Sequence, residues 1–348
     1  MNATQYRESS KDPFALRIVR LLPCRVSGPL LQELDCYGIR GIIASAVGVP
    51  ADCPTEVRWE HGWQWDPITC VEQLAPYIQL SDCHLVATLC HSEFLKKRGY
   101  LNVHAVGMPI LYVSQPKVAR IPGSLLVMPP HSLSWTEHEW NEDAYIQFVL
   151  GIRSRFSSLT ACISGPCVDH GYWCNSFEKA GIPWIRGAEA ADQNALERVR
   201  MMFSMFEFMT TNTMGSHVAY ASLSGCKVSI AGSYAALEAA PYKNDEFYQA
   251  HPEVLTANLE RASEGIVREY YPEFFCDPDK AVMRVPWAEK ALGKECMRSP
   301  REIAGLLGWP QNKRQLLRYE VRNFARQEGW PRRIAGSLFK VVRSLRRN

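Results

Sequence analysis

The sequence lacks the patterns that define several large protein classes. It has no stretch of about 18 apolar residues that would span a bilayer, and its polar amino end has no apolar run of the secretory-signal kind. The P-loop pattern GxxxxGK[ST], the dinucleotide fingerprint GxGxxG and the nucleophile elbow GxSxG are also missing. We therefore expect a cytoplasmic protein that is neither a P-loop ATPase nor a serine hydrolase with such an elbow.

Metal-ligand spacings are scarce as well. Cys83-His84 with Cys90-His91 form one group of potential ligands, and Cys162, Cys167 and Cys174 with Asp169-His170 form another. Neither group has a CxxC or HExxH spacing, so we expect no metal site. In a long chain without a secretory signal, the twelve cysteines are expected to be reduced thiols.

Length and composition indicate a globular protein of more than one domain. The 348 residues exceed what one core usually fills, and 47% of them are hydrophobic. The formal net charge is only +3, which is too small for a protein that binds nucleic acid through its phosphates. We expect no nucleic-acid partner.

The charge is unevenly distributed along the chain. Residues 313–348 carry eleven basic and two acidic side chains, a balance of +9 that leaves −6 for the rest. Within this segment, residues 330–348 place apolar residues at helical spacing with Arg and Lys on the remaining arc. The pattern predicts a basic amphipathic helix that binds an anionic membrane surface, while the alternative is a solvated helix that packs on the body.

Strands and helices alternate through the second half of the chain. Short apolar runs typical of buried parallel strands alternate with helix-like segments, several of which end at glycine. The expected strands are 125–128, 160–163, 183–185, 206–209 and 227–231. The expected helices are 142–156, 170–180, 192–205 and 214–224. This alternation predicts a doubly wound parallel sheet with helices on both faces.

A similar unit precedes it. We expect strands at 84–89 and 103–106 around a helix at 92–98 capped by Ser92, with a helix at 29–36 and a strand at 39–43 upstream. The predicted fold is therefore α/β, with two Rossmann-like doubly wound parallel-sheet domains and a basic helical tail. The expected domains are 1–118, 119–300 and 301–348.

The strongest local signal is the segment Thr210-Thr211-Asn212-Thr213-Met214-Gly215-Ser216-His217, where a strand ends and a helix begins. Ligands of open α/β sheets bind beyond the carboxyl ends of the strands. Free amides of a first helical turn, the helix dipole and nearby hydroxyls suit a phosphate. The alternative is that Thr211 or Asn212 only caps the helix.

Two further segments place histidines at strand ends. In Glu60-His61-Gly62-Trp63-Gln64-Trp65-Asp66, His61 is a candidate general base and Asp66 its orienting group or a second base, unless His61 is a packed turn residue. In Pro129-Pro130-His131-Ser132, the last two residues are candidate contacts to a phosphate or sugar, unless the prolines only shape a loop.

Taken together, these segments resemble bacterial surface-polysaccharide (lipopolysaccharide or capsule) glycosyltransferases of the GT-B fold. The resemblance spans roughly residues 55–235. It rests on HGWQW at 61–65, SEFLKKRGYLNVHAVGMP at 92–109, PPHS at 129–132, GIPWIRGAEAAD at 181–192 and TTNTMGSHVAYASLSGCKVSI at 210–230.

The resemblance implies two sheet domains that face a cleft, with a nucleotide-sugar donor on the second domain and the acceptor and base on the first. His61 would be the base, His131 and Ser132 would contact the donor, and the phosphate would be held by Thr211, Asn212, Gly215, Ser216 and His217. No metal or other cofactor is implied, and the acceptor would be a glycan or a lipid-linked sugar at the inner face of the membrane. Polyol-phosphate transferases and nucleotide-sugar epimerases share this fold, and a noncatalytic membrane-peripheral protein that binds nucleotide or glycan is a further alternative.

Overall fold

The computed structural model describes residues 7–30, 33–131 and 138–327. The chain forms two compact units, one of residues 1–39 and 58–297 and one of residues 40–57 and 298–348. The domain boundaries expected after residues 118 and 300 stay predictions. Both sheets lie in the first unit.

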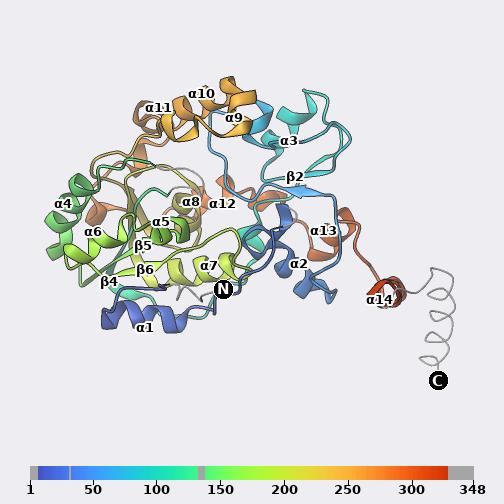
Figure 1. Cartoon of the computed structure of the whole chain (residues 1–348), viewed down its shortest axis with the longest axis horizontal. Helices are drawn as coiled ribbons and strands as arrows, with labels where there is room; N and C mark the ends of the chain where they lie inside the picture. The colour runs from blue at the N-terminus through green and yellow to red at the C-terminus, as the bar shows by residue number, and fades with distance from the viewer. Residues whose placement is uncertain (1–6, 31–32, 132–137, 328–348) are drawn as a thin grey trace. The chain divides into compact units, whose positions relative to one another are not determined.

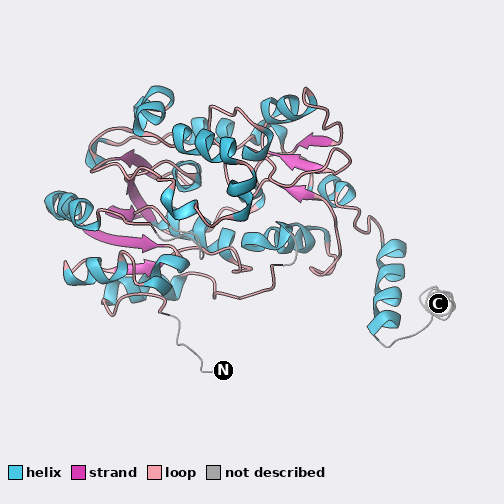
Figure 2. Ribbon diagram, turned by 45° about the horizontal axis from the view of Figure 1, so that its top comes forward, coloured by secondary structure: helices cyan, strands magenta, loops and turns pink. Residues whose placement is uncertain are grey.

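The larger sheet has five parallel strands in the order β6-β5-β4-β7-β8. Its strands appear as one group of arrows in Figure 2. They are β4 (Ile121–Met128), β5 (Ser158–Ile163), β6 (Trp184–Arg186), β7 (Phe206–Thr211) and β8 (Lys227–Ile230). The five strands expected in this half of the chain are confirmed, and the order makes the sheet doubly wound, because the chain starts at the central β4 and moves outward twice.

Helices connect these strands, as parallel pairing requires. They are α4 (Glu142–Ile152), α5 (Gly165–His170), α6 (Cys174–Lys179), α7 (Ala195–Met205) and α8 (Ser216–Leu223). The single helix expected at 170–180 is wrong, because Gly171 (φ +81°) and Trp173 (φ +60°) break it between α5 and α6.

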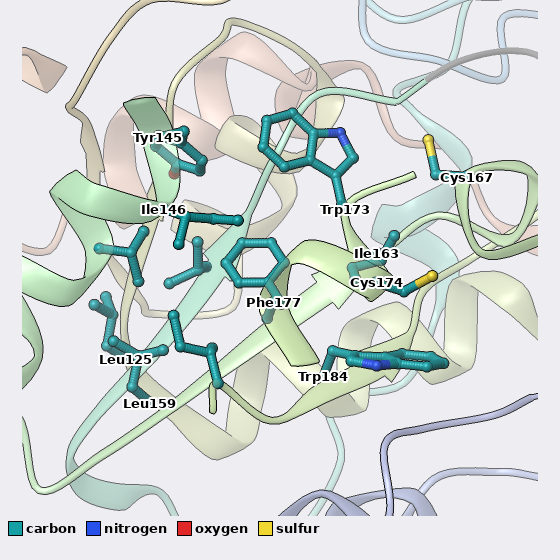
Figure 3. Close-up of a cluster of buried hydrophobic side chains, with 14 of the residues drawn as sticks. Leu125, Tyr145, Ile146, Leu159, Ile163, Cys167, Trp173, Cys174, Phe177 and Trp184 are labelled. Atoms are coloured by element: carbon teal, nitrogen blue, oxygen red, sulfur yellow. The ribbon is translucent and has the colours of Figure 1, made fainter. Parts of the chain in front are cut away.

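The main core lies between β4–β6 and the helices α4–α6. Trp173, Phe177 and Trp184 are almost fully buried there beside Leu125 and Tyr145, and Figure 3 shows these side chains converging. Burial of large aromatic and aliphatic side chains is the main favourable term in folding, so this cluster holds the helices on the sheet.

An arm from the start of the chain covers the β6 edge of the larger sheet. The Ser10 amide donates to the Trp184 carbonyl (2.9 Å), and the Arg186 amide donates to the Glu8 carbonyl (2.7 Å). Helix α1 (Pro13–Leu21), capped by Asp12, continues this arm. Because an open strand edge pairs readily with other chains, the arm protects the sheet.

The smaller sheet has three parallel strands in the order β1-β2-β3. They are β1 (Arg58–Trp59), β2 (His84–Val86) and β3 (Val103–Ala105), with α3 (Leu89–Lys96) as the crossover between the last two. In the described residues this sheet winds in one direction, where a doubly wound one was expected. The expected cap at Ser92 is wrong, because the Thr88 side chain caps α3 four residues earlier.

Further helices follow β8. They are α9 (Glu246–Ala250), α10 (Pro252–Arg261), α11 (Glu264–Tyr270) and α12 (Val285–Ala291). Helices α9, α10 and α11 lie side by side in Figure 1, and α12 packs on α8.

The second unit consists of helices. They are most of α2 (Ile39–Val47), α13 (Pro300–Leu306) and α14 (Lys313–Gln327). Tyr319 and Asn323 of α14 donate hydrogen bonds to Asp52 (3.3 Å each), which joins α14 to the loop after α2. The helix expected at 29–36 and the strand expected at 39–43 are wrong: residues 33–38 form a kinked 3-10 turn, and the short apolar run Ile39-Arg40-Gly41-Ile42-Ile43 starts α2. A run this short fits either element.

Candidate functional site

Carboxyl ends of strands from both sheets meet at one cavity of about 490 Å³. His61 follows β1, Pro130 and His131 follow β4, and residues 213–217 follow β7. All of these residues line the cavity. Residues of the three candidate segments found in the sequence therefore line the same cavity.

The larger sheet contributes its topological switch point to this pocket. From β4 the chain moves to β5 and β6 on one side, and then crosses to β7 and β8 on the other. Ligands of open α/β sheets bind in the crevice at such a point, outside the carboxyl ends of the two strands. Here that crevice lies between the loops that follow β4 and β7.

Some residues of the loop after β7 are buried inside the protein, and others line the cavity. Thr211 and Asn212 are buried and do not line the cavity. The Thr211 hydroxyl lies 2.9 Å from Nε2 of His217, and Asn212 Nδ2 donates to the Ser233 carbonyl (2.8 Å). These two residues therefore shape the loop from inside.

Gly215, Ser216 and His217 face the cavity instead. Gly215 is the N-cap of α8, and no side chain caps the helix there. A Cβ atom at Gly215 would lie 3.0 Å from the His217 ring, so the glycine lets the imidazole lie close to the backbone. An uncapped helix start next to a cavity is suited to bind an anion.

His217 is a neutral histidine at physiological pH. Burial is the main cause, with His131 as a smaller one, and together they lower its pKa to about 3. The imidazole at the cavity wall is therefore uncharged, with a single N–H donor. Ser132, which was predicted together with His131 as a contact to the donor, lies outside the described residues.

The pKa of His217 predicts a pH dependence of stability. Between pH 6.5 and about 3, the unfolded chain binds a proton at His217 that the folded protein does not, so the stability linked to this group is complete above pH 6.5 and falls as the pH drops. In urea unfolding, the wild type should therefore lose more stability than His217→Gln between pH 7 and pH 5. Between pH 8 and pH 7 the two proteins should change in parallel, and equal losses at acid pH would contradict the assignment.

His61 is held in place at the end of β1. Its ring packs against Tyr37 (centroids 5.9 Å apart, 33° between the planes), and its carbonyl accepts a hydrogen bond from the Tyr220 hydroxyl (3.3 Å). Tyr37 has a φ of +59°, and such strained residues cluster at functional sites. His61 therefore has a fixed backbone and a supported ring at the wall of the pocket.

Asp66 does not line this cavity. It is exposed, and its backbone amide donates to the Tyr271 hydroxyl (3.1 Å). Its charge is a minor influence that favours the protonated forms of His91 and Arg261. Its expected role as a partner of His61 or as a second base stays a prediction.

A buried ion pair beside His61 had no role in the sequence prediction. Glu60 is 3% exposed and lines the cavity; its Oε2 accepts from the Ala87 amide (3.0 Å) and lies 3.2 Å from Nδ1 of His91. Oε1 has no hydrogen-bond partner. Burial lowers the pKa of His91, but the charge and hydrogen bond of Glu60, together with the charge of Asp66, raise it, and the net shift is upward. The alternation of strands and helices in the sequence could not have identified this pair, because the two residues are 31 positions apart.

A second buried charged side chain that the sequence prediction did not include is Arg261 of α10. Arg261 is 7% exposed, lines the cavity, and lies over the ring of Trp65 (4.6 Å to the centroid). Its Nη1 donates to the Trp65 carbonyl (3.3 Å), and its Nη2 donates to Gln64 Oε1 (3.1 Å). No sequence signal marked this arginine, which lies in an ordinary helical segment.

The structure also bears on metals and membranes. The described residues contain no group of three or more His, Cys, Asp or Glu side chains placed to hold a metal ion. Among the helices in the described ranges, none is long and apolar enough to cross a bilayer. All twelve cysteines carry free thiols.

Comparison with known proteins adds one likeness. No protein-family model and no curated protein sequence matches this chain. Among solved structures, the chain is similar to one described as the crystal structure of a GtfA/B complex, with 16% sequence identity and a TM-score of 0.26. The match covers 62% of this chain and 45% of that one, so it spans less than half of the other chain's length.

Proposed function

We propose that this protein is a glycosyltransferase that moves a sugar from a nucleotide-activated donor to a hydroxyl of a surface-polysaccharide or lipid-linked acceptor. One observation carries the proposal: the switch point of the larger sheet and the end of β1 in the smaller sheet line the same cavity. The assigned phosphate site and a histidine thus line the same cavity.

The donor phosphate is assigned to the start of α8. Ser216 and His217 lie at its first turn, where free amides and the helix dipole favour negative charge. His131, after β4, lines the cavity on the other side of the switch point and is assigned to the donor sugar or phosphate. This arrangement stabilises the leaving phosphate without requiring a metal ion.

His61 is assigned as the base. It removes the proton from the acceptor hydroxyl as the new bond from that oxygen to the anomeric carbon forms, and the bond from this carbon to the phosphate oxygen breaks. The electron pair of the broken bond leaves with the nucleotide, whose developing charge faces the α8 amides. Glu60 is a second candidate base, because its Oε1 is buried without a hydrogen-bond partner at the same strand end.

Nucleotide binding tests the donor site. A ligand that binds only the folded protein raises its stability by about 2.7 kcal/mol at 100 times Kd, so one nucleoside diphosphate from a panel should raise the melting temperature by a few degrees. Gly215→Val, which brings branched carbons to the His217 ring, should weaken this binding at least tenfold. Gly151→Ala, in α4 outside the cavity, adds a Cβ that meets nothing within 4 Å and serves as the control. A panel without any shift, or a variant that binds as well as the wild type, would contradict the donor site.

Transfer itself is measured with nucleotide sugars and membrane extract as the acceptor source. Binding of nucleotide without any transfer would favour the noncatalytic alternative.

We further propose that the basic tail holds the enzyme at the inner face of the membrane. Residues 330–348 lie outside the described residues, so this proposal rests on their charge and helical spacing. Deleting them should lower cosedimentation with vesicles containing anionic lipid at least tenfold, with no change for neutral vesicles. Equal sedimentation of the two proteins with anionic vesicles would refute the proposal.

A further inference from the structure

Two buried N–H groups at one end of the cavity have no acceptor. Nε of Arg261 and Nε1 of Trp65 are both buried, and neither has a hydrogen-bond partner. Both side chains line the cavity, and both can only donate. Buried polar groups in folded proteins are nearly always paired, so two unpaired donors at one place indicate a ligand that supplies acceptors.

The same end of the cavity holds a buried cation, Arg261. In the part of the chain that the structure describes, Arg261 takes part in no ion pair, and its neutral acceptors are Trp65, Gln64 and Asn258. Burial without a paired carboxylate lowers the pKa of Arg261 to about 10. Glu60 is already paired with His91. A buried cation that no carboxylate contacts favours an anionic ligand.

The rim beside this end is aromatic. Tyr77 is 63% exposed, has a φ of +62°, and its ring lies 4.8 Å from that of Phe247. Tyr242 and Tyr248 also line the cavity, with their ring centroids 5.2 Å apart. Exposed aromatic faces offer flat apolar surface with a polar edge, which suits the ring of a sugar.

We propose that this end of the cavity, formed by Trp65, Tyr77, Phe247 and Arg261, binds an acceptor saccharide that carries an anionic group. The group is the carboxylate of a sugar acid or a phosphate ester, and its oxygens accept the N–H groups of Arg261 and Trp65. This inference rests on the proposed function, because it assigns the α8 end to the donor and the Arg261 end to the acceptor.

Binding of simple sugars tests the proposal directly. Affinities of the full-length protein for glucuronic acid, glucose 6-phosphate and glucose are measured by NMR titration. At least one anionic sugar should bind ten times more tightly than glucose, and the stronger of the two identifies carboxylate or phosphate as the preferred group. Equal binding of all three would overturn the proposal.

Four variants locate the effect. Arg261→Gln and Trp65→Phe should both reduce the preference for the anionic sugar to less than threefold. Trp65→Phe removes the N–H donor but keeps an aromatic ring at this position, which limits the loss of packing. Arg261→Lys, which keeps the charge without Nε, should retain part of the preference. Arg268→Gln removes an exposed arginine of α11 that does not line this cavity, and should change nothing.

A parallel titration with the nucleoside diphosphate separates this inference from the proposed function. Arg261→Gln should leave nucleotide binding within threefold of the wild type. If that variant loses the nucleotide and keeps the anionic sugar, Arg261 belongs to the donor and the inference is wrong. If the wild type binds anionic sugar but no nucleotide, the proposed function is wrong and the anion site stands.

Discussion

Replacing His61 with alanine should lower kcat for sugar transfer by about 10²- to 10⁴-fold, the usual contribution of a positioned general base. The donor KM should change by less than threefold, because the assigned phosphate contacts lie on the other sheet. Initial rates at saturating donor and acceptor measure the effect. The expectation follows from the place of His61 at the wall of the cavity, with its ring against Tyr37 and its carbonyl bonded to Tyr220.

Two variants make this result specific. His170→Ala removes an exposed histidine at the end of α5, outside the cavity, and should retain wild-type activity. Glu60→Gln keeps the shape of the neighbouring candidate and should lower kcat by less than tenfold if His61 is the base. A large loss in Glu60→Gln together with nearly full activity in His61→Ala would assign the base to Glu60 instead.

Replacing Gly293 with alanine should destabilise the first unit by about 2–5 kcal/mol. Gly293 follows α12 with a φ of +73°, a conformation that costs an L-residue about 1–2 kcal/mol. Its new Cβ would also lie 2.0 Å from the carbonyl oxygen of Ala87, which requires the backbone to move, and such overpacking adds about 1–3 kcal/mol. Urea unfolding followed by circular dichroism measures the change.

The substitution at Gly293 should also disturb the cavity wall next to His61. The Ala87 amide donates to Glu60 Oε2, so moving Ala87 disturbs the end of β1 next to His61. Gly265→Ala in α11 is the matched control: its Cβ meets nothing within 4 Å, and alanine in a helix should stabilise by about 0.5–1 kcal/mol. A Gly293→Ala protein as stable as the wild type would show that this contact is not tight in solution.

The larger sheet could be predicted because each of its strands carries its own signal. Buried parallel strands such as β4 and β8 are short apolar runs, and turn residues follow them. The order of the strands carries no such local signal. Whether β7 lies beside β4 or beyond β6 depends on packing between distant segments, and this order is what creates the switch point.

The site shows the same division. The position of His61, His131 and Gly215–His217 at the cavity could be predicted, because each follows a predicted strand and ligands of this fold class bind at strand ends. Thr211 and Asn212 belong to the same segment, but the turn directs them into the protein. Arg261 and His91 could not be assigned from the sequence, because only the folded chain brings α10 and α3 to the end of β1.

The arm that covers β6 has a practical consequence for every measurement above. Shortened versions of this protein should begin no later than Glu8, because its carbonyl and the Ser10 amide complete the hydrogen bonds of that strand. A version starting after α1 would leave the outer edge of β6 unpaired, and this exposed edge would promote aggregation during purification. Loss of activity in such a version would then reflect aggregation of the protein and not the loss of a catalytic group.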